Sequence, residues 1–93
     1  MARQLIVKAR FQRAYDRLSE VEQGLVKKAL QLLHGYVESG HASGGLGLKK
    51  LGSGVDEFRT GLALRGVYVE EGSVLALAIL GSHEDVRRFL KRQ

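Results

Sequence analysis

The chain has 93 residues, a formal net charge of +5 and no cysteine. This length supports one hydrophobic core, so we expect a single domain over residues 1–93, and a disulfide scaffold is excluded. No stretch approaches the roughly 20 apolar residues that cross a bilayer, and the N-terminal MARQLIVKARF has too short an apolar segment for a signal peptide. We therefore expect a cytoplasmic protein with no membrane partner. Its basic surplus favours a polyanionic partner, nucleic acid or acidic protein, but is also consistent with a surface that merely keeps the domain soluble.

The first half of the chain predicts a strand followed by two helices. Gln4–Ala9 is short, apolar and rich in β-branched residues, which is typical of a strand. Apolar residues then recur at helical spacing over Phe11–Leu18. Ser19 and Glu22 have the spacing of a capping box, so a second helix is expected from Ser19 to a stop at Gly40. Its predicted apolar face consists of Val21, Leu25, Ala29, Leu32, Leu33, Tyr36 and Val37. The two helices are expected to form a hairpin that packs on a sheet.

The second half predicts an antiparallel sheet and a terminal helix. A flexible, glycine-rich connection is expected over residues 41–47. The expected strands are 48–51, 55–60, 62–69 and 73–80, separated by turns at 52–54, 61 and 70–72. Val74–Leu80 is apolar on both faces, which indicates a central strand. Ser82 and Asp85 repeat the capping-box spacing before a short helix. The predicted class is α+β, with an N-terminal strand, a helical hairpin packed on a four-stranded, mostly antiparallel sheet, and a short C-terminal helix.

This order of elements resembles the RelE/ParE superfamily of toxins from bacterial toxin–antitoxin pairs. The similarity covers nearly the whole chain and includes the stretches LKKL, EFRTGLALRGVY and LGSHEDV. Its clearest segments are the Arg-x-x-Tyr from Arg65 to Tyr68 and the glycine, histidine and valine after the last strand. GSHEDV is most similar to the Gly-Thr-His-Ser-Asp-Leu-Phe pattern of YafQ-like members, which resemble RelE in cutting messenger RNA on the ribosome. The resemblance implies a ribosome-dependent endoribonuclease, silenced by a cognate antitoxin in a hetero-oligomer.

His83 is the candidate acid or base of such a reaction. In metal-free RNA cleavage the 2′-OH attacks the adjacent phosphate, so the site needs a base, an acid and cations, and an imidazole can serve as either acid or base near neutral pH. His83 follows the central strand in the first turn of a helix, where backbone N–H groups favour a phosphate. The alternative is that Ser82 and Asp85 merely cap the helix and His83 is an ordinary exposed residue.

Arg59 and Arg65 are the candidate phosphate ligands. Arginine suits this role because its fixed fork of donors engages phosphate oxygens and stays charged. The resemblance makes Arg65 a phosphate ligand at the cleavage site, and it places Arg59 where YafQ-like members have a catalytic histidine and RelE-like members an arginine. If Gly61 lies at the turn, both arginines reach the same face. The alternative for both is a solvated strand face that pairs with Glu57 or another acid.

Two further basic pairs are candidates for binding RNA or phosphate. Lys49 and Lys50 precede a turn and could grip an RNA backbone, although charged residues on an edge strand also prevent aggregation. Arg87 and Arg88 follow His83 by about one helical turn. Arg87 stands where the family has an aromatic residue, and arginine is a poor proton donor, so His83 would carry more of the proton transfer.

Two other functions remain open. A ParE-like inhibitor of DNA gyrase would need no RNA chemistry, and it is favoured by Arg87 in place of the family aromatic and by the lack of RelE's lysines on the strand of Arg59. An inactive relative that only binds an antitoxin is also compatible with the sequence. His83, Arg59 and Arg65 together favour the nuclease. No HExxH or paired Cys/His spacing is present, so neither a metal nor another cofactor is expected.

Overall fold

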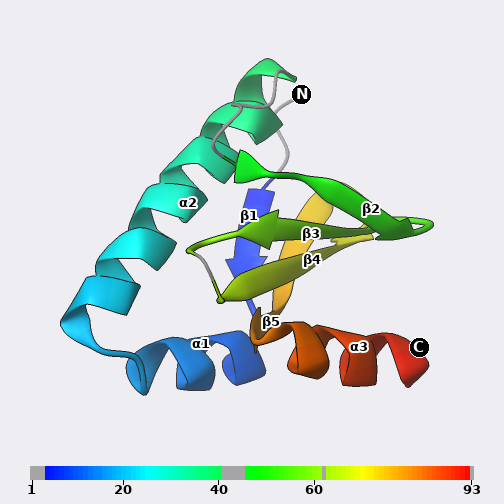
Figure 1. Ribbon diagram of the computed structural model, residues 1–93. Coiled ribbons are helices and arrows are strands. Elements are labelled where there is room, and N and C mark those ends of the chain that lie inside the picture. The colour runs from blue at the N-terminus through cyan, green and yellow to red at the C-terminus, as the bar shows by residue number, and fades with distance from the viewer. Residues whose placement is uncertain (1–3, 41–45, 62, 93) are drawn as a thin grey trace.

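The computed structural model describes residues 4–40, 46–61 and 63–92. Within these ranges the elements are β1 (Gln4–Val7), α1 (Ala9–Asp16), α2 (Glu20–Ser39), β2 (Lys49–Gly52), β3 (Val55–Arg59), β4 (Arg65–Glu71), β5 (Val74–Gly81) and α3 (His83–Lys91) (Figure 1). The predicted α+β class and order of elements are confirmed. Most of the expected connection, residues 41–45, and position 62 of an expected strand lie outside the described residues. Over the described part of the chain, no helix has the length and apolar character needed to span a membrane.

The strands form one sheet in the order β1-β5-β4-β3-β2. The four strands after the hairpin are antiparallel to their sequence neighbours, and β1 adds a fifth strand parallel to β5, which lies inside the sheet as predicted. β1 pairs only with Val74–Leu77 of β5. The chain then leaves the sheet, after the Lys8 N–H donates to the Leu77 carbonyl at 3.0 Å, and enters α1. The end of β5, residues 78–81, therefore has α1 rather than a strand on its outer side.

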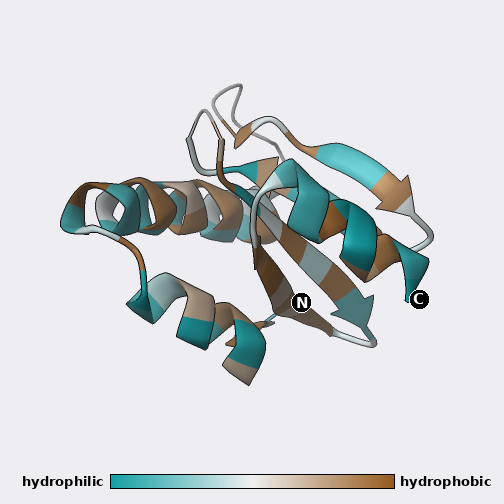
Figure 2. Ribbon diagram, turned by 60° about the horizontal axis from the view of Figure 1, so that its bottom comes forward, coloured by the Kyte–Doolittle hydropathy of each residue, from teal (hydrophilic) through white to brown (hydrophobic). Residues whose placement is uncertain are grey.

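Helices cover both faces of the sheet. α1 and α2 pack on one face, in a core that includes Phe11, Leu33, Phe58 and Leu77. α3 packs on the other face, where Val86 contacts a smaller core containing Val67 and Ile79. Figure 2 shows apolar colouring on the strands and polar colouring over much of the outer side of α3. Because helices cover both faces of β4 and β5, side chains on either face of these strands lie beside a helix.

The apolar face of α2 differs from the predicted one. Val21 and Leu25 are 75% and 44% exposed, whereas Val26, which was not assigned to the face, is fully buried together with Ala29 and Leu33. The sequence of α2 contains two overlapping apolar stripes, and helical periodicity alone does not choose between them. Packing on the sheet selects the stripe through Val26 and leaves the first turns of the other in solvent.

Both predicted capping boxes are present. The Ser19 Oγ accepts from the Glu22 N–H at 3.2 Å, while Glu22 Oε1 accepts from the Ser19 N–H. At the start of α3, Ser82 Oγ accepts from the Asp85 N–H at 3.2 Å and Asp85 Oδ2 accepts from the Ser82 N–H at 2.9 Å. α2 ends at Gly40, whose φ of 78° is the left-handed conformation that glycine adopts at low cost.

Substituting Gly66 by alanine is expected to destabilise the fold. Gly66 pairs with Phe58 across β3 and β4, and a Cβ on Gly66 would overlap the Phe58 ring in the buried core. Overpacking of this kind costs about 1–3 kcal/mol or more. Gly24 and Gly35 are matched controls, because they lie in α2 with open space around a new Cβ. Alanine at either control position is expected to add about 0.5–1 kcal/mol of stability in urea unfolding. Equal stabilities of the Gly66→Ala and wild-type proteins would contradict this account of the core.

Candidate active site

Two of the predicted site residues lie directly opposite each other in the sheet. Arg59 at the end of β3 pairs with Arg65 at the start of β4, and Arg65 pairs with Gly81 of β5. Paired residues of antiparallel strands point to the same face, with Cβ atoms about 5 Å apart. The loop between the two arginines is closed by the Thr60 N–H, which donates to the Leu64 carbonyl at 3.1 Å, and Gly61 lies within it as expected. The arginines therefore share the face of the sheet that α3 covers.

Arg65 is held by a buried acid. Its Nη1 lies 3.2 Å from Glu57 Oε1, with the side chains 24% and 3% exposed. Although this is an ion-pair distance, the N–H is not directed for a hydrogen bond, and Oε1 has no hydrogen-bond partner among the described residues. Removing a charge of either sign here would leave the other buried without compensation. The pairing that the sequence left as an alternative for Arg65 is thus present, and it leaves other donors of the guanidinium fork unused.

Arg59 is the more accessible of the two arginines. Its side chain is exposed and makes no hydrogen bond or ion pair with a described residue. Its aliphatic stem lies against Gly47, where an added Cβ would come within 3.2 Å of Arg59 Cγ and Cδ. Gly47 has a φ of 57°, so glycine is favoured there by backbone conformation as well as by space. The close approach of this loop orients the stem of Arg59, and no described residue occupies its guanidinium.

His83 begins α3 just beyond the row formed by Arg59, Arg65 and Gly81. It is exposed and forms no hydrogen bond or ion pair with the described residues. The Ser82 hydroxyl already takes one first-turn N–H, and two carboxylates lie in that turn, so the helix end is less open to a phosphate than the sequence indicated. Any phosphate held beside His83 must therefore depend mainly on arginine side chains.

The paired lysines do not act on one surface. Lys49 pairs with Glu57, and Lys50 pairs with Asp56 in β3. Because successive strand residues point to opposite faces, Lys49 lies on the α3 face with Arg65, and Lys50 lies on the face covered by α1 and α2. The expectation that both lysines grip one RNA backbone does not fit this arrangement, since the register, which the sequence does not give, separates them.

The two arginines of α3 also differ. Arg87 is exposed and lies one turn after His83, so it is on the same side of the helix. Arg88 instead turns back to Asp85, with its Nη2 3.0 Å from Asp85 Oδ1. The pKa of Asp85 is held below its ordinary value, first by the Ser82 backbone N–H, then by the Ser82 hydroxyl, and also by the charges of Arg88 and Arg10. Arg88 is thus committed to the helix start, while Arg87 is available to a ligand.

Tyr68 of the Arg-x-x-Tyr segment is a core residue. It is 2% exposed, and its ring centroid lies 6.4 Å from that of Phe58. Burial raises the pKa of the Tyr68 hydroxyl well above its ordinary value, with a further contribution from its hydrogen bond to Asp56 across the strand pair. The tyrosine is therefore on the face opposite to Arg65 and does not reach the site on the α3 face.

The raised pKa of Tyr68 makes stability fall at alkaline pH. The unfolded state loses the tyrosine proton above about pH 10, whereas the folded state retains it. The contribution of Tyr68 is therefore complete below that pH and is lost as the pH rises toward the folded pKa. In Tyr68→Phe this part of the decline should disappear, with a loss of about 1 kcal/mol at neutral pH from the missing hydrogen bond. Urea unfolding over alkaline pH checks this, and Tyr15→Phe serves as control because Tyr15 is only half-buried. An unchanged alkaline slope in Tyr68→Phe would disprove the assignment.

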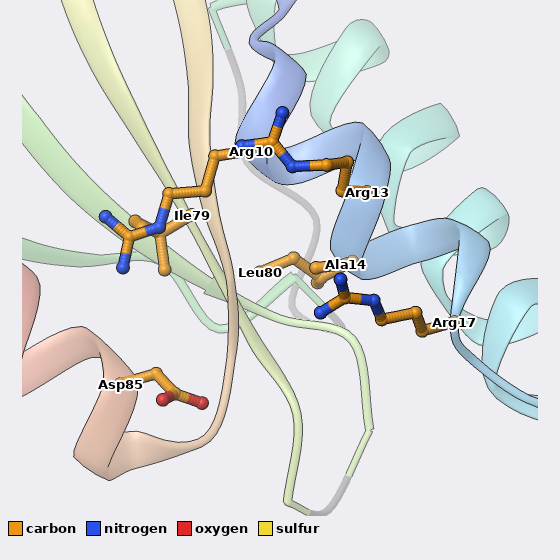
Figure 3. A pocket seen from close by; sticks show the side chains of 7 residues that line it. All are labelled: Arg10, Arg13, Ala14, Arg17, Ile79, Leu80 and Asp85. Carbon is orange, nitrogen blue, oxygen red and sulfur yellow. The ribbon is translucent and has the colours of Figure 1, made fainter.

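One hollow in the described structure is lined by none of the predicted site residues. Arg10, Arg13 and Arg17, here called the arginine row, extend from α1 and from the residue that caps it into a hollow of about 460 Å³ (Figure 3). The signal was present in the sequence, because the three arginines are spaced i, i+3 and i+7. Only the apolar pattern on the adjacent face of the same helix was used in the prediction. No group of three or more His, Asp and Glu side chains suited to a metal ion occurs within the described ranges.

Solved toxin structures share this fold. The YoeB dimer from Staphylococcus aureus is 21% identical with a TM-score of 0.68, and the match covers 89% of this chain and 99% of YoeB. YafQ from E. coli is 14% identical with a TM-score of 0.69, covering 90% and 97%. An archaeal RelE–RelB complex from Pyrococcus horikoshii is 17% identical with a TM-score of 0.63, covering 88% and 96%. No family model matches the sequence, and the search of curated proteins finds no match. The chain therefore has the α+β fold of RelE, YoeB and YafQ toxins, as the resemblance predicted.

Proposed function

We propose that the protein is the toxin of a toxin–antitoxin pair and cleaves messenger RNA on the ribosome without a metal ion. The observation that carries this proposal is the row of Arg59, Arg65 and Gly81 across three strands, with α3 and His83 starting just beyond it. The row brings together two cations from the ends of different strands and a potential proton carrier from a helix start. The shared fold with RelE, YoeB and YafQ toxins supports the same function.

In the proposed reaction the RNA supplies its own nucleophile. The 2′-oxygen forms a bond to phosphorus while the bond from phosphorus to the 5′-oxygen breaks, leaving a 2′,3′-cyclic phosphate and a 5′-hydroxyl. A base removes the 2′-OH proton, an acid protonates the leaving 5′-oxygen, and cations stabilise the charge on the phosphate oxygens. His83 performs one of the proton transfers, and Arg59 and Arg65 bind the phosphate. Glu57 lies beside Nη1 of Arg65 and orients the guanidinium, and the other N–H donors of Arg65 are left for the substrate.

The remaining basic candidates contribute unequally to RNA binding. Lys49 and Arg87 lie on the same face as the site and are exposed, so they suit contacts to the backbone of the message. Lys50 lies on the opposite face, and Arg88 is paired with Asp85. We assign Lys50 to the solubility of the edge strand β2 and Arg88 to the stabilisation of the start of α3. Phosphate contacts from Lys49 and Arg87 would strengthen binding without reading sequence.

An antitoxin is the proposed protein partner. The archaeal RelE of similar fold occurs in a complex with RelB, which supports a hetero-oligomer for this chain as well. An acidic or mixed segment that covers the basic face around Arg59 would block the site and neutralise its charge.

Primer extension on a message in translating ribosomes tests the proposed activity. Wild-type protein is expected to produce cuts within the ribosomal A site. Absence of cuts from folded protein would refute the nuclease proposal. A DNA gyrase supercoiling assay would then test the ParE-like alternative, for which the arginines opposite each other would be a docking surface.

A further inference from the structure

The arginine row faces the hollow as a continuous basic wall. Arg10, Arg13 and Arg17 lie on one side of α1 because they are separated by three and four residues. At 1.5 Å per residue the row is about 10 Å long. Figure 3 shows its side chains on the side of α1 that faces the end of β5, with α3 across the hollow. Three guanidinium groups therefore stand along an opening of about 460 Å³.

The hollow exists because the sheet lacks a strand at this point. β1 stops opposite Leu77, so the outer side of residues 78–81 is left to α1. The helix approaches this edge through Ala14, a small residue, between two arginines of the row. Ile79 and Leu80 also line the hollow, but they are only 2% and 7% exposed and belong to the cores on opposite faces of the sheet. The arginine side chains therefore provide most of the surface that a ligand could reach.

The positive charge of the hollow is not cancelled within the described structure. None of the three arginines forms an ion pair or hydrogen bond with a described side chain. Asp85, on the opposite wall, is the one acid that lines the hollow. Its oxygens are occupied by the Ser82 N–H at 2.9 Å, the Ser82 hydroxyl at 3.0 Å and Arg88 at 3.0 Å. The Asp85 charge acts on Arg88 and, through space, on Arg10 of the row, and Arg13 and Arg17 have no such acidic neighbour among the described residues lining the hollow, so the arginine row remains a site for an anion.

We propose that the arginine row binds the sugar–phosphate backbone of single-stranded RNA, as a second contact surface separate from Arg59 and Arg65. A row about 10 Å long suits a polyanion with repeated charges better than one isolated anion. Arginine binds phosphate oxygens bidentately and also stacks on bases, so the row can contact both parts of a nucleotide. Only the choice of RNA as the polyanion rests on the proposed function.

The hollow also lies beside the proposed active site. Asp85, in its wall, belongs to the same first turn of α3 as His83. An RNA strand along the arginine row would therefore pass next to the start of α3. This position allows the row to hold one part of the strand while the face with Arg59 holds another, which increases affinity through two linked contacts.

Binding to an uncleavable RNA tests the proposal without relying on catalysis. The probe is a fluorescent, unstructured single-stranded RNA with 2′-O-methyl groups, followed by anisotropy over a range of salt. The test variant is Arg10→Gln/Arg13→Gln/Arg17→Gln, and the control of equal charge is Lys27→Gln/Lys91→Gln/Arg92→Gln, which changes exposed residues elsewhere. Losing three phosphate contacts should reduce the slope of log K against log salt by about 2. The affinity difference from wild type should therefore shrink about 100-fold between 0.1 and 1 M salt. The control should retain most of the slope.

Each outcome bears on the proposal. Equal affinity and slope in the test and control variants, with folding verified by circular dichroism, would overturn it. Wild-type protein that does not bind the RNA at low salt would overturn it as well. If the test variant keeps RNA binding but loses binding to polyglutamate, the occupant is an acidic protein segment and the RNA assignment is wrong. If binding depends on the arginine row while wild type makes no cuts on ribosomes, the inference stands and the nuclease proposal fails.

Discussion

Replacing His83 by alanine is expected to lower the rate of message cleavage by about 10²–10⁴-fold, the usual contribution of a positioned acid or base. The expected loss is large because no other described imidazole stands at the start of α3, and Arg87, one turn later, stays charged and does not transfer protons readily. Stability should change little, since His83 is exposed and makes no described contact. Primer extension on translating ribosomes measures the rate, and thermal unfolding measures the stability.

His34 provides a matched control for this experiment. It is an exposed helical histidine, paired with Glu38 at 3.0 Å, and lies far along α2. His34→Ala should cut at the wild-type rate. His83→Gln keeps a polar side chain of similar length but transfers no proton, so it should be nearly as slow as His83→Ala. Wild-type cleavage by both His83 variants would remove this residue from the mechanism and leave the capping alternative as its description.

The order of elements was predictable because each element carries its own local signal. The two capping boxes at Ser19 and Ser82 fixed the starts of α2 and α3, and Gly40 marked the end of α2. The two-residue periodicity and glycine turns identified the strands after residue 47. These signals arise from backbone hydrogen bonds and φ angles within a few residues, so they do not depend on the rest of the fold. The α+β class followed from their order.

What the sequence did not provide was the relation between elements. The opposite faces of Lys49 and Lys50 follow from the β2–β3 register, with its irregularity between Lys50 and Gly52. Burial of Val26 rather than Leu25 follows from how α2 rests on the sheet. The hollow beside the arginine row depends on the short length of β1, which leaves the end of β5 without a neighbouring strand. Each of these depends on contacts between residues far apart in the chain.

The burial of Glu57 at the candidate site also depends on contacts between distant residues and could not be predicted from the sequence. From the sequence, Glu57 was named only in the alternative in which Arg59 and Arg65 lie on a solvated strand face, yet it is 2% exposed. Its neighbours in the sheet are Lys49 and Val67, and α3 covers the same face. A buried carboxylate needs a nearby cation, which Arg65 supplies. Arg65 therefore has a structural role in addition to its proposed role in binding phosphate, and mutation to alanine alone does not separate them.

Arg65→Ala is expected to reduce the free energy of unfolding by about 3 kcal/mol, the lower end of the range for breaking a buried ion pair. The lower end is appropriate because Arg65 is 24% exposed and water screens part of its charge. Arg88→Ala is the comparison for an exposed pair. Its partner Asp85 is 44% exposed, so the loss should stay below about 1 kcal/mol. Urea unfolding of the two variants measures both values. Equal losses would mean that Glu57 is compensated by solvent rather than by Arg65.

A double variant separates the two roles of Arg65. Arg65→Met/Glu57→Leu replaces the ion pair with apolar side chains of similar volume, which is often neutral or stabilising for a buried pair. Most of the stability lost in Arg65→Ala should therefore return. Cleavage of ribosome-bound message should not return, because methionine offers no donors to a phosphate. Restored stability with restored cleavage would make Arg65 a purely structural residue and leave Arg59 as the phosphate ligand on this face. Restored stability without cleavage would show that the charged pair of Arg65 and Glu57 is needed for cleavage itself, since the fold would then be intact and only the two charged groups would be missing.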